Sequence, residues 1–167
     1  DTVQIATTGN AADFGDITVA RGDNGSASNS IRGLCLGGTT GGGTVVNVID
    51  YVTIATFGNA TDFGDLANGD TLNSMAMPAH GGIDLDSIQR PSVTYMPGSG
   101  RGLFGGGYTP SYSNVINLTH IPTLGDSSDF GDCTIAAGHA FNAASNYTRL
   151  VKAGGHTGST TDVIESI

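Results

Sequence analysis

The residues best suited to chemistry in this sequence are aspartates that recur in a short motif. The tetrad Asp-Phe-Gly-Asp occurs three times, and its carboxylates belong to Asp13, Asp16, Asp62, Asp65, Asp129 and Asp132. An Asn or Asp precedes each tetrad by three residues. Carboxylate oxygens at this spacing in a tight turn can coordinate Ca²⁺, so calcium is one candidate ligand.

A structural role for the tetrads is the favoured interpretation. Aspartate and asparagine stabilise turns by accepting hydrogen bonds from their own backbone. The aromatic members, Phe14, Phe63 and Phe130, are then expected to fill the cores of three similar units. A catalytic site seldom needs three copies, and the motifs of serine hydrolases, zinc proteases and phosphate-binding loops do not occur. We therefore expect a protein that is not an enzyme and needs no cofactor, calcium being the alternative.

Composition excludes several classes of partner. Fifteen acidic residues against six basic ones give a net charge of −9, which repels nucleic-acid phosphates and anionic membrane surfaces. No segment approaches the roughly 18 consecutive apolar residues of a membrane-spanning helix, so membrane insertion is not expected. Glycine supplies 27 of the 167 residues, without the three-residue period of collagen. Cys35 and Cys133 are expected as unpaired, partly buried thiols, with a bridge between them as the alternative.

An arginine module repeats in step with the tetrads. Arg32, Arg101 and Arg149 each open a short apolar run that ends in a glycine pair. The first and third of these arginines follow their tetrads by 19 and 20 residues, and the second by 39. Copy two therefore carries an insertion within about residues 66–100, and the period is otherwise about 50. We expect the three arginines to be structural, bonding backbone carbonyls or an aspartate of the neighbouring unit.

These patterns predict an all-β repeat array. Residues 45–56 are rich in β-branched side chains, and Gly, Ser, Asn and Thr-rich turns separate such runs. The pattern of runs and turns in each copy predicts about one blade of four antiparallel strands. A period near 50 is typical of β-propellers. We expect one repeat domain over residues 1–167, with copy one at 1–44, copy two at 45–112 and copy three at 113–167.

Both ends of the sequence fall within a repeat. Residues 1–5 correspond to residues 50–54, and residues 162–167 supply the part of the strand that precedes them. A half-strand leaves an unpaired sheet edge, which tends to acquire a partner. Three blades are also fewer than the roughly four to eight of propellers. We therefore expect the array to be completed by oligomerisation or by neighbouring repeats.

The repeated string resembles a family of virus proteins. The run N-V-I-D-Y-V-T-I-A-T-x-G-N-A-x-D-F-G-D, with R-G-L-F-G-G-G after it, is similar to Gly-rich repeats of tailed-phage virions. These are tail-fibre-like and structural proteins of phages that infect marine cyanobacteria and related hosts. The glycine pairs also resemble those of kelch blades. The resemblance implies a kelch-like propeller at the virion surface that mediates assembly and host attachment. Its partners would be copies of itself, other virion proteins and a host-surface glycan.

Two other functions stay open at this point. One is a carbohydrate-binding module built as an oligomeric propeller, and the other is a subunit of an extracellular filament polymerised through its terminal strands. Individual binding function is expected in the insertion, because loops on a rigid scaffold carry variable sites. Its candidate binding residues are Met77, Tyr95 and Met96. The tripeptide Arg21-Gly22-Asp23 matches an adhesion motif, although an arginine before a polar turn describes it equally well.

Overall fold

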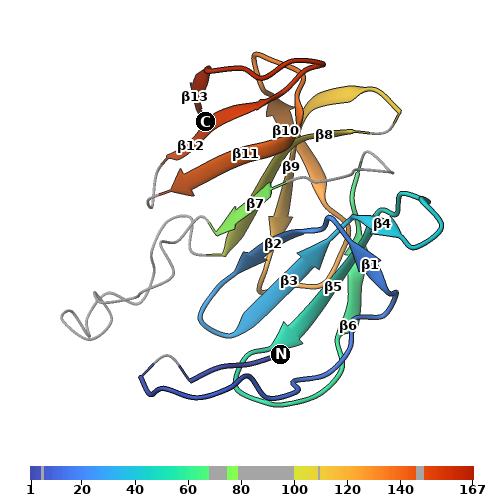
Figure 1. Ribbon diagram of the computed structural model, residues 1–167, viewed down its shortest axis with the longest axis vertical. Coiled ribbons are helices and arrows are strands. Elements are labelled where there is room, and N and C mark those ends of the chain that lie inside the picture. Colours follow the sequence, from blue (N-terminus) through green and yellow to red (C-terminus); the bar gives the residue numbers. More distant parts are fainter. Residues whose placement is uncertain (5, 68–74, 79–99, 109, 146–148) are drawn as a thin grey trace.

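The computed structural model describes residues 1–4, 6–67, 75–78, 100–108, 110–145 and 149–167 (Figure 1). The secondary-structure elements of this part of the chain are all β-strands. They form small antiparallel sheets. The fold is therefore all-β, as the sequence predicts. The described residues include no helix long and apolar enough to cross a membrane.

Three larger sheets follow one another along the chain. The first, in the order β2-β3-β5-β6, contains β2 (Gly25–Ser28), β3 (Arg32–Leu36), β5 (Val48–Thr53) and β6 (Thr61–Asp65). The second, in the order β10-β9-β8-β7, contains β7 (Met75–Pro78), β8 (Arg101–Tyr108), β9 (Tyr112–His120) and β10 (Ser128–Asp132). The third, in the order β11-β12-β13, contains β11 (Gly138–Ser145), β12 (Leu150–His156) and β13 (Ile164–Ser166). A small sheet pairs β1 (Arg21–Gly22) with β4 (Thr39–Thr40).

Each of the first two sheets combines strands from two successive copies of the sequence. Strands β2 and β3 lie in copy one, whereas β5 and β6 lie in copy two. The expectation that each copy forms its own sheet is therefore wrong. The physical reason is that the arginine strand of one copy pairs with the first tetrad-hairpin strand of the next, β3 with β5 and β8 with β9.

Three hairpins carry the tetrads, and their turns share one backbone hydrogen bond. We call residues 1–16 the first hairpin, residues 48–65 the second and residues 112–132 the third. Their turns are closed by the same backbone hydrogen bond, from Thr7 to Gln4 (3.4 Å), from Thr56 to Thr53 (3.1 Å) and from Thr123 to His120 (3.1 Å). In the second and third hairpins the strand register shifts at the tetrad phenylalanine, which is the extra residue of a β-bulge.

The glycine pair that ends each arginine module also has a repeated backbone conformation. The first glycine of the pair has a φ of +56°, +79° or +76°, in the order Gly37, Gly106 and Gly154. The second has a φ of +112°, +138° or +126°, in the order Gly38, Gly107 and Gly155. Side-chain-bearing residues rarely adopt these angles. The pairs are therefore required by the backbone path, which explains why they recur.

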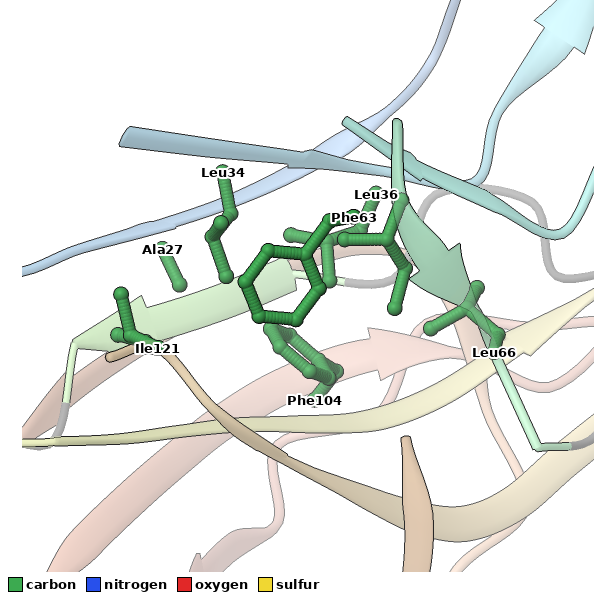
Figure 2. Packing of buried hydrophobic residues seen from close by; sticks show 8 residues of the cluster. Ala27, Leu34, Leu36, Phe63, Leu66, Phe104 and Ile121 are labelled. Carbon is green, nitrogen blue, oxygen red and sulfur yellow. The ribbon is translucent and has the colours of Figure 1, made fainter. Parts of the chain in front are cut away.

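The main core lies between the first and second sheets. Figure 2 shows the ring of Phe63, from β6, directed toward that of Phe104, from β8. The other buried members of this cluster are Ala27, Leu34, Leu36, Ile49, Leu66 and Ile121. Full burial of one such large side chain contributes roughly 1.5–3 kcal/mol. This core fixes the second and third hairpins relative to each other.

Candidate functional site

The first and second tetrads each begin with an aspartate that binds its own backbone. Asp13 Oδ1 accepts a hydrogen bond from the Gly15 N–H at 3.2 Å, and Asp62 Oδ1 accepts one from the Gly64 N–H at the same distance. These are the turn-stabilising contacts that the sequence suggests for this motif. The carboxylates therefore shape the bulge from which the rest of the tetrad projects.

The first tetrad docks on the turn of the second hairpin. The Gly58 N–H donates to the carbonyl of Phe14 at 2.9 Å, and the Ala60 N–H donates to the carbonyl of Asp16 at 2.8 Å. In the opposite direction, the Asp16 N–H donates to Oδ1 of Asn59 at 3.0 Å. We call this set of three hydrogen bonds a junction.

The second tetrad forms the same junction with the turn of the third hairpin. The Gly125 N–H donates to the carbonyl of Phe63 at 3.0 Å, and the Ser127 N–H donates to that of Asp65 at 2.8 Å. The Asp65 N–H donates to Oδ1 of Asp126 at 3.0 Å. The Asn or Asp that precedes each later tetrad is thus the acceptor for the tetrad of the previous hairpin.

The junction requires glycine at the third tetrad position. Gly15 and Gly64 have φ angles of +144° and +149°. A Cβ built on Gly64 would lie 2.6 Å from the carbonyl oxygen of Gly125, and a Cβ on Gly15 would overlap the carbonyl of Gly58 in the same way. Both the backbone angle and the close approach of the next turn therefore exclude a side chain.

The third tetrad has the same shape but a different environment. Gly131 has a φ of +150°, and a Cβ placed on it would meet no atom within 4 Å. Phe130 is 46% exposed, whereas Phe63 is 4% exposed and Phe14 is half-buried against Phe57, with ring centroids 5.4 Å apart. The expectation that Phe130 fills a core is therefore wrong for the described chain. Phe63 lies in the main core, and the turn at residues 125–127 docks on its tetrad. No described residues cover Phe130 in the same way.

The tetrad aspartates are distributed rather than gathered. Among the described residues no group of three or more His, Cys, Asp or Glu side chains is placed to hold a metal ion. Asp13 and Asp62 each use one oxygen for the turn. The calcium alternative therefore has no supporting geometry in the described part of the chain.

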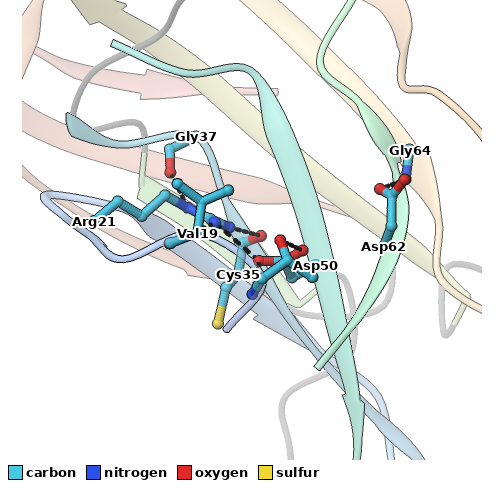
Figure 3. A network of polar contacts seen from close by, with 8 residues as sticks. Val19, Arg21, Cys35, Gly37, Asp50, Asp62 and Gly64 are labelled. Atoms are coloured by element: carbon cyan, nitrogen blue, oxygen red, sulfur yellow. Dashed lines mark hydrogen bonds and ion pairs between the residues drawn. The ribbon is translucent and has the colours of Figure 1, made fainter. Parts of the chain in front are cut away.

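One buried polar position in each of the three larger sheets is linked to a segment that follows a tetrad. Asp50 is fully buried, and its carboxylate lies 2.8 Å from the guanidinium of Arg21 (Figure 3). The same carboxylate accepts hydrogen bonds from the Thr18 backbone at 3.2 Å and from its hydroxyl at 2.6 Å. Arg21 also donates to the carbonyls of Gly37 and Cys35. Arg21 is thus part of the interior, which removes it from any adhesion motif.

The equivalent position in the third sheet is Glu165. Its carboxylate lies 3.0 Å from the ammonium of Lys152 and accepts hydrogen bonds from the backbone and hydroxyl of Thr134 and from the Ile135 N–H. Burial disfavours the charged form, but the hydrogen bonds from Thr134 and Lys152 outweigh it and hold the pKa of Glu165 below its ordinary value.

In the second sheet the same position is neutral. Asn117 is buried, and its Oδ1 accepts a hydrogen bond at 3.2 Å from the Ser127 hydroxyl, whose oxygen in turn accepts one at 2.7 Å from the Ala67 N–H. This position is not among the functional residues predicted from the sequence. The sequence holds a signal for it, because the fourth residue of N-V-I-D, N-V-I-N and D-V-I-E is polar and directly follows two apolar strand residues.

The repeated arginines have different surroundings. Arg32 donates to the carbonyls of Ile121 and Pro122, both at 3.0 Å, and its guanidinium lies 4.8 Å from the ring centroid of Tyr51. It therefore ties the first sheet to the turn of the third hairpin. Arg101 and Arg149 occupy the matching positions and are exposed.

The remaining candidate residues are those of the insertion and the two cysteines. Met77 is part of β7, and Tyr95 and Met96 lie outside the described residues. Cys35 and Cys133 are free thiols. Burial raises the pKa of both, which keeps them protonated and unreactive at neutral pH.

A glycine replacement tests the close contact in the second junction. Gly64→Ala places a Cβ against the carbonyl of Gly125, whereas Gly131→Ala meets the same backbone strain in open space. We expect Gly64→Ala to lower the free energy of unfolding by about 1–3 kcal/mol more than Gly131→Ala. Urea denaturation of the two variants measures this difference. Equal losses in the free energy of unfolding would show that the close contact at Gly64 does not affect stability.

A double replacement tests the buried ion pair. Arg21→Met leaves the Asp50 carboxylate buried without its cation, and we expect a loss of about 3–5 kcal/mol in the free energy of unfolding. Adding Asp50→Asn creates the neutral amide that Asn117 already provides in the second sheet, so the double variant should regain much of that loss. Denaturant unfolding checks both values, and a single variant as stable as the parent contradicts the assignment.

The pH dependence of stability tests Glu165. Because its pKa in the folded chain lies below the ordinary value of 4.5, the unfolded chain binds more protons in this range and stability rises with pH. The contribution is present above about pH 4.5 and is lost as pH falls through the lower, folded pKa. We expect Glu165→Gln to flatten this fall. Unfolding free energies at stepped pH measure it, and an unchanged slope rejects the role.

The described geometry is therefore a series of repeated contacts between successive hairpins rather than a pocket of convergent reactive groups. Two junctions are complete, from the first tetrad to residues 58–60 and from the second to residues 125–127. The third tetrad presents the same atoms without a partner hairpin in the described chain. Comparison of the sequence with protein-family models and with curated proteins gives no match.

Proposed function

We propose that this protein is a non-enzymatic structural and adhesion component of a phage virion, exposed at its surface. In this proposal the three larger sheets are blades of a propeller-like, kelch-like array that further copies or neighbouring repeats complete. The observation that carries it is the pair of identical junctions. A chain whose units join by one repeated rule is suited to building an extended scaffold.

Repetition also suits attachment to a host surface. Linked weak sites gain avidity because binding at one site raises the effective concentration at the next. The partners in this proposal are other copies of the chain, other virion proteins and a host-surface glycan. The net charge of −9 keeps such an array soluble and free of nucleic acid.

The contacts of the tyrosines favour assembly over a dedicated carbohydrate site. Sugar sites use exposed aromatic platforms beside polar groups. Tyr51 is instead covered by Arg32 and packs edge-on against Phe63, with ring centroids 6.0 Å apart. Tyr108 and Tyr112 pack on each other at 5.1 Å. These half-buried rings pack against other side chains of the scaffold.

Gold-labelled antibody against the protein tests the proposed location. We expect electron micrographs of material from its source to show label on tailed particles. Label confined to fibres without heads would replace the proposal with the filament alternative. Purified protein should also slow adsorption of those particles to host cells by competing for the surface, whereas the chain unfolded by heat should not. Unlabelled particles together with unchanged adsorption reject the proposal.

A further inference from the structure

The turn of the second hairpin contains a small hollow that is open to solvent. Its volume is about 160 Å³. Residues from both arms of the hairpin and from the turn between them line it, and they include Tyr51, Thr53, Thr56, Phe57, Asn59 and Thr61. Pockets for drug-sized ligands measure roughly 300–1,000 Å³. This hollow therefore suits one small unit of a ligand.

The first hairpin contains a hollow at the same positions of the repeat. Its volume is about 250 Å³. Its lining includes Thr2, Gln4, Thr7, Asn10 and Ala12. Each of these precedes its counterpart in the second hairpin by 49 residues. Phe57 lines both hollows, and both hairpin turns lie at the lower end of the molecule in Figure 1. The hollows are therefore neighbours and belong to the repeated hairpin design.

Phe57 supplies an aromatic ring that the two hollows share. Its side chain is 71% exposed. Its ring packs on that of Phe14, with centroids 5.4 Å apart and an angle of 45° between the ring planes. Because this contact restricts the ring before a ligand binds, less side-chain entropy is lost on binding. Unlike the ring of Tyr51, which Arg32 covers, Phe57 thus offers an exposed aromatic platform.

The polar groups of the second hairpin's hollow are hydroxyls and an amide. Thr56 and Thr61 are exposed, and Thr53 is half-buried. Each threonine hydroxyl can both donate and accept hydrogen bonds. Oδ1 of Asn59 accepts a hydrogen bond from the Asp16 N–H at 3.0 Å, so the NH₂ of Asn59 is the group that can donate to a ligand. A ligand with several hydroxyl groups would match these donors and acceptors.

Charge narrows the class of ligand. The described residues that line the two hollows carry no formal charge. The chain as a whole has a net charge of −9, which repels anionic ligands. A neutral sugar in its ring form has an apolar face of C–H groups and an edge of hydroxyls. Its face can cover an aromatic ring, which removes apolar surface from water, while its hydroxyls bond to threonine and asparagine.

We infer that the hollows of the first and second hairpins bind neighbouring neutral sugar units of a host-surface glycan, with Phe57 as the shared aromatic contact. The inference rests on the proposed function, and it gives the glycan partner of that proposal a site and a chemical class. Each hollow is small and open, so a single sugar binds weakly. A chain of sugars that fills both hollows gains affinity, because the second unit binds at a high effective concentration.

The turn of the third hairpin does not offer the same groups. Leu124 occupies the place of Phe57 there. Thr123, the counterpart of Thr56, already has a partner for its hydroxyl, which lies 3.0 Å from Nδ1 of His120. We therefore expect no sugar to bind at this turn, and its residues provide controls within the same chain.

Two replacements remove the aromatic and the polar contact separately. Phe57→Ala removes the shared ring. Leu124→Ala is its matched control, because Leu124 is 57% exposed at the equivalent position. Thr56→Val removes a hydroxyl and keeps a β-branched side chain. Thr44→Val, on an exposed turn in another part of the chain, is the control for that change.

NMR titration of the isotopically labelled protein measures binding at these sites. The neutral probes are the methyl glycosides of glucose, galactose, mannose, rhamnose and N-acetylglucosamine, and N-acetylneuraminic acid is the charged probe. We expect a neutral glycoside to shift the backbone amide signals of Thr56 and Gly58, and the charged sugar to leave them in place. Phe57→Ala should raise the dissociation constant about tenfold and Thr56→Val about threefold, whereas both control variants should leave it unchanged.

Three results would overturn the inference. They are neutral glycosides that leave these signals in place, shifts caused by N-acetylneuraminic acid alone, and equal affinities of Phe57→Ala and Leu124→Ala. An oligosaccharide of the sugar that binds should also shift the amide signal of Thr7 and bind more tightly than the single unit, and equal dissociation constants contradict the paired sites. Labelled virions without these shifts would leave the proposed function standing while the inference fails.

Discussion

The backbone hydrogen bonds between a tetrad and the next turn are the contact on which the rest of the structure depends. They leave no room for a side chain at Gly15 or Gly64, and they set Asn59 and Asp126 as acceptors for the preceding unit. Because backbone groups make most of these bonds, the junction tolerates variation in the flanking side chains. The way in which successive hairpins dock on one another thus follows from main-chain geometry.

The buried polar position is a second constraint on the structure, and it accepts more than one type of residue. Asp50, Asn117 and Glu165 occupy one place in the three larger sheets, and each anchors the segment that follows a tetrad, Asn117 through the Ser127 hydroxyl. Two of them meet a cation, Arg21 or Lys152, and the third meets a hydroxyl. Since a buried charge without a partner is costly, the cation and the carboxylate must be present or absent together.

Local patterns in the sequence predicted the strands and turns well, because they depend on nearby residues. β-branched runs form β5, and the recurring glycine pairs have the backbone angles that only glycine readily adopts. Pairing between copies could not be read in the same way. The partner of β3 is β5 in the next copy, and the ion pair of Arg21 with Asp50 joins distant residues. The exposure of Phe130 likewise depends on what lies beside it, which its own tetrad does not encode.

The sharing of the first two sheets between successive copies has a consequence for how such genes change. Loss or duplication of one whole copy brings the arginine strand of one copy next to a tetrad hairpin of identical register. The rejoined strands can pair as β3 and β5 do, so array length can vary through recombination where the buried polar residues that then meet are also compatible. The same interlocking means that copy two cannot separate without opening a sheet on each side.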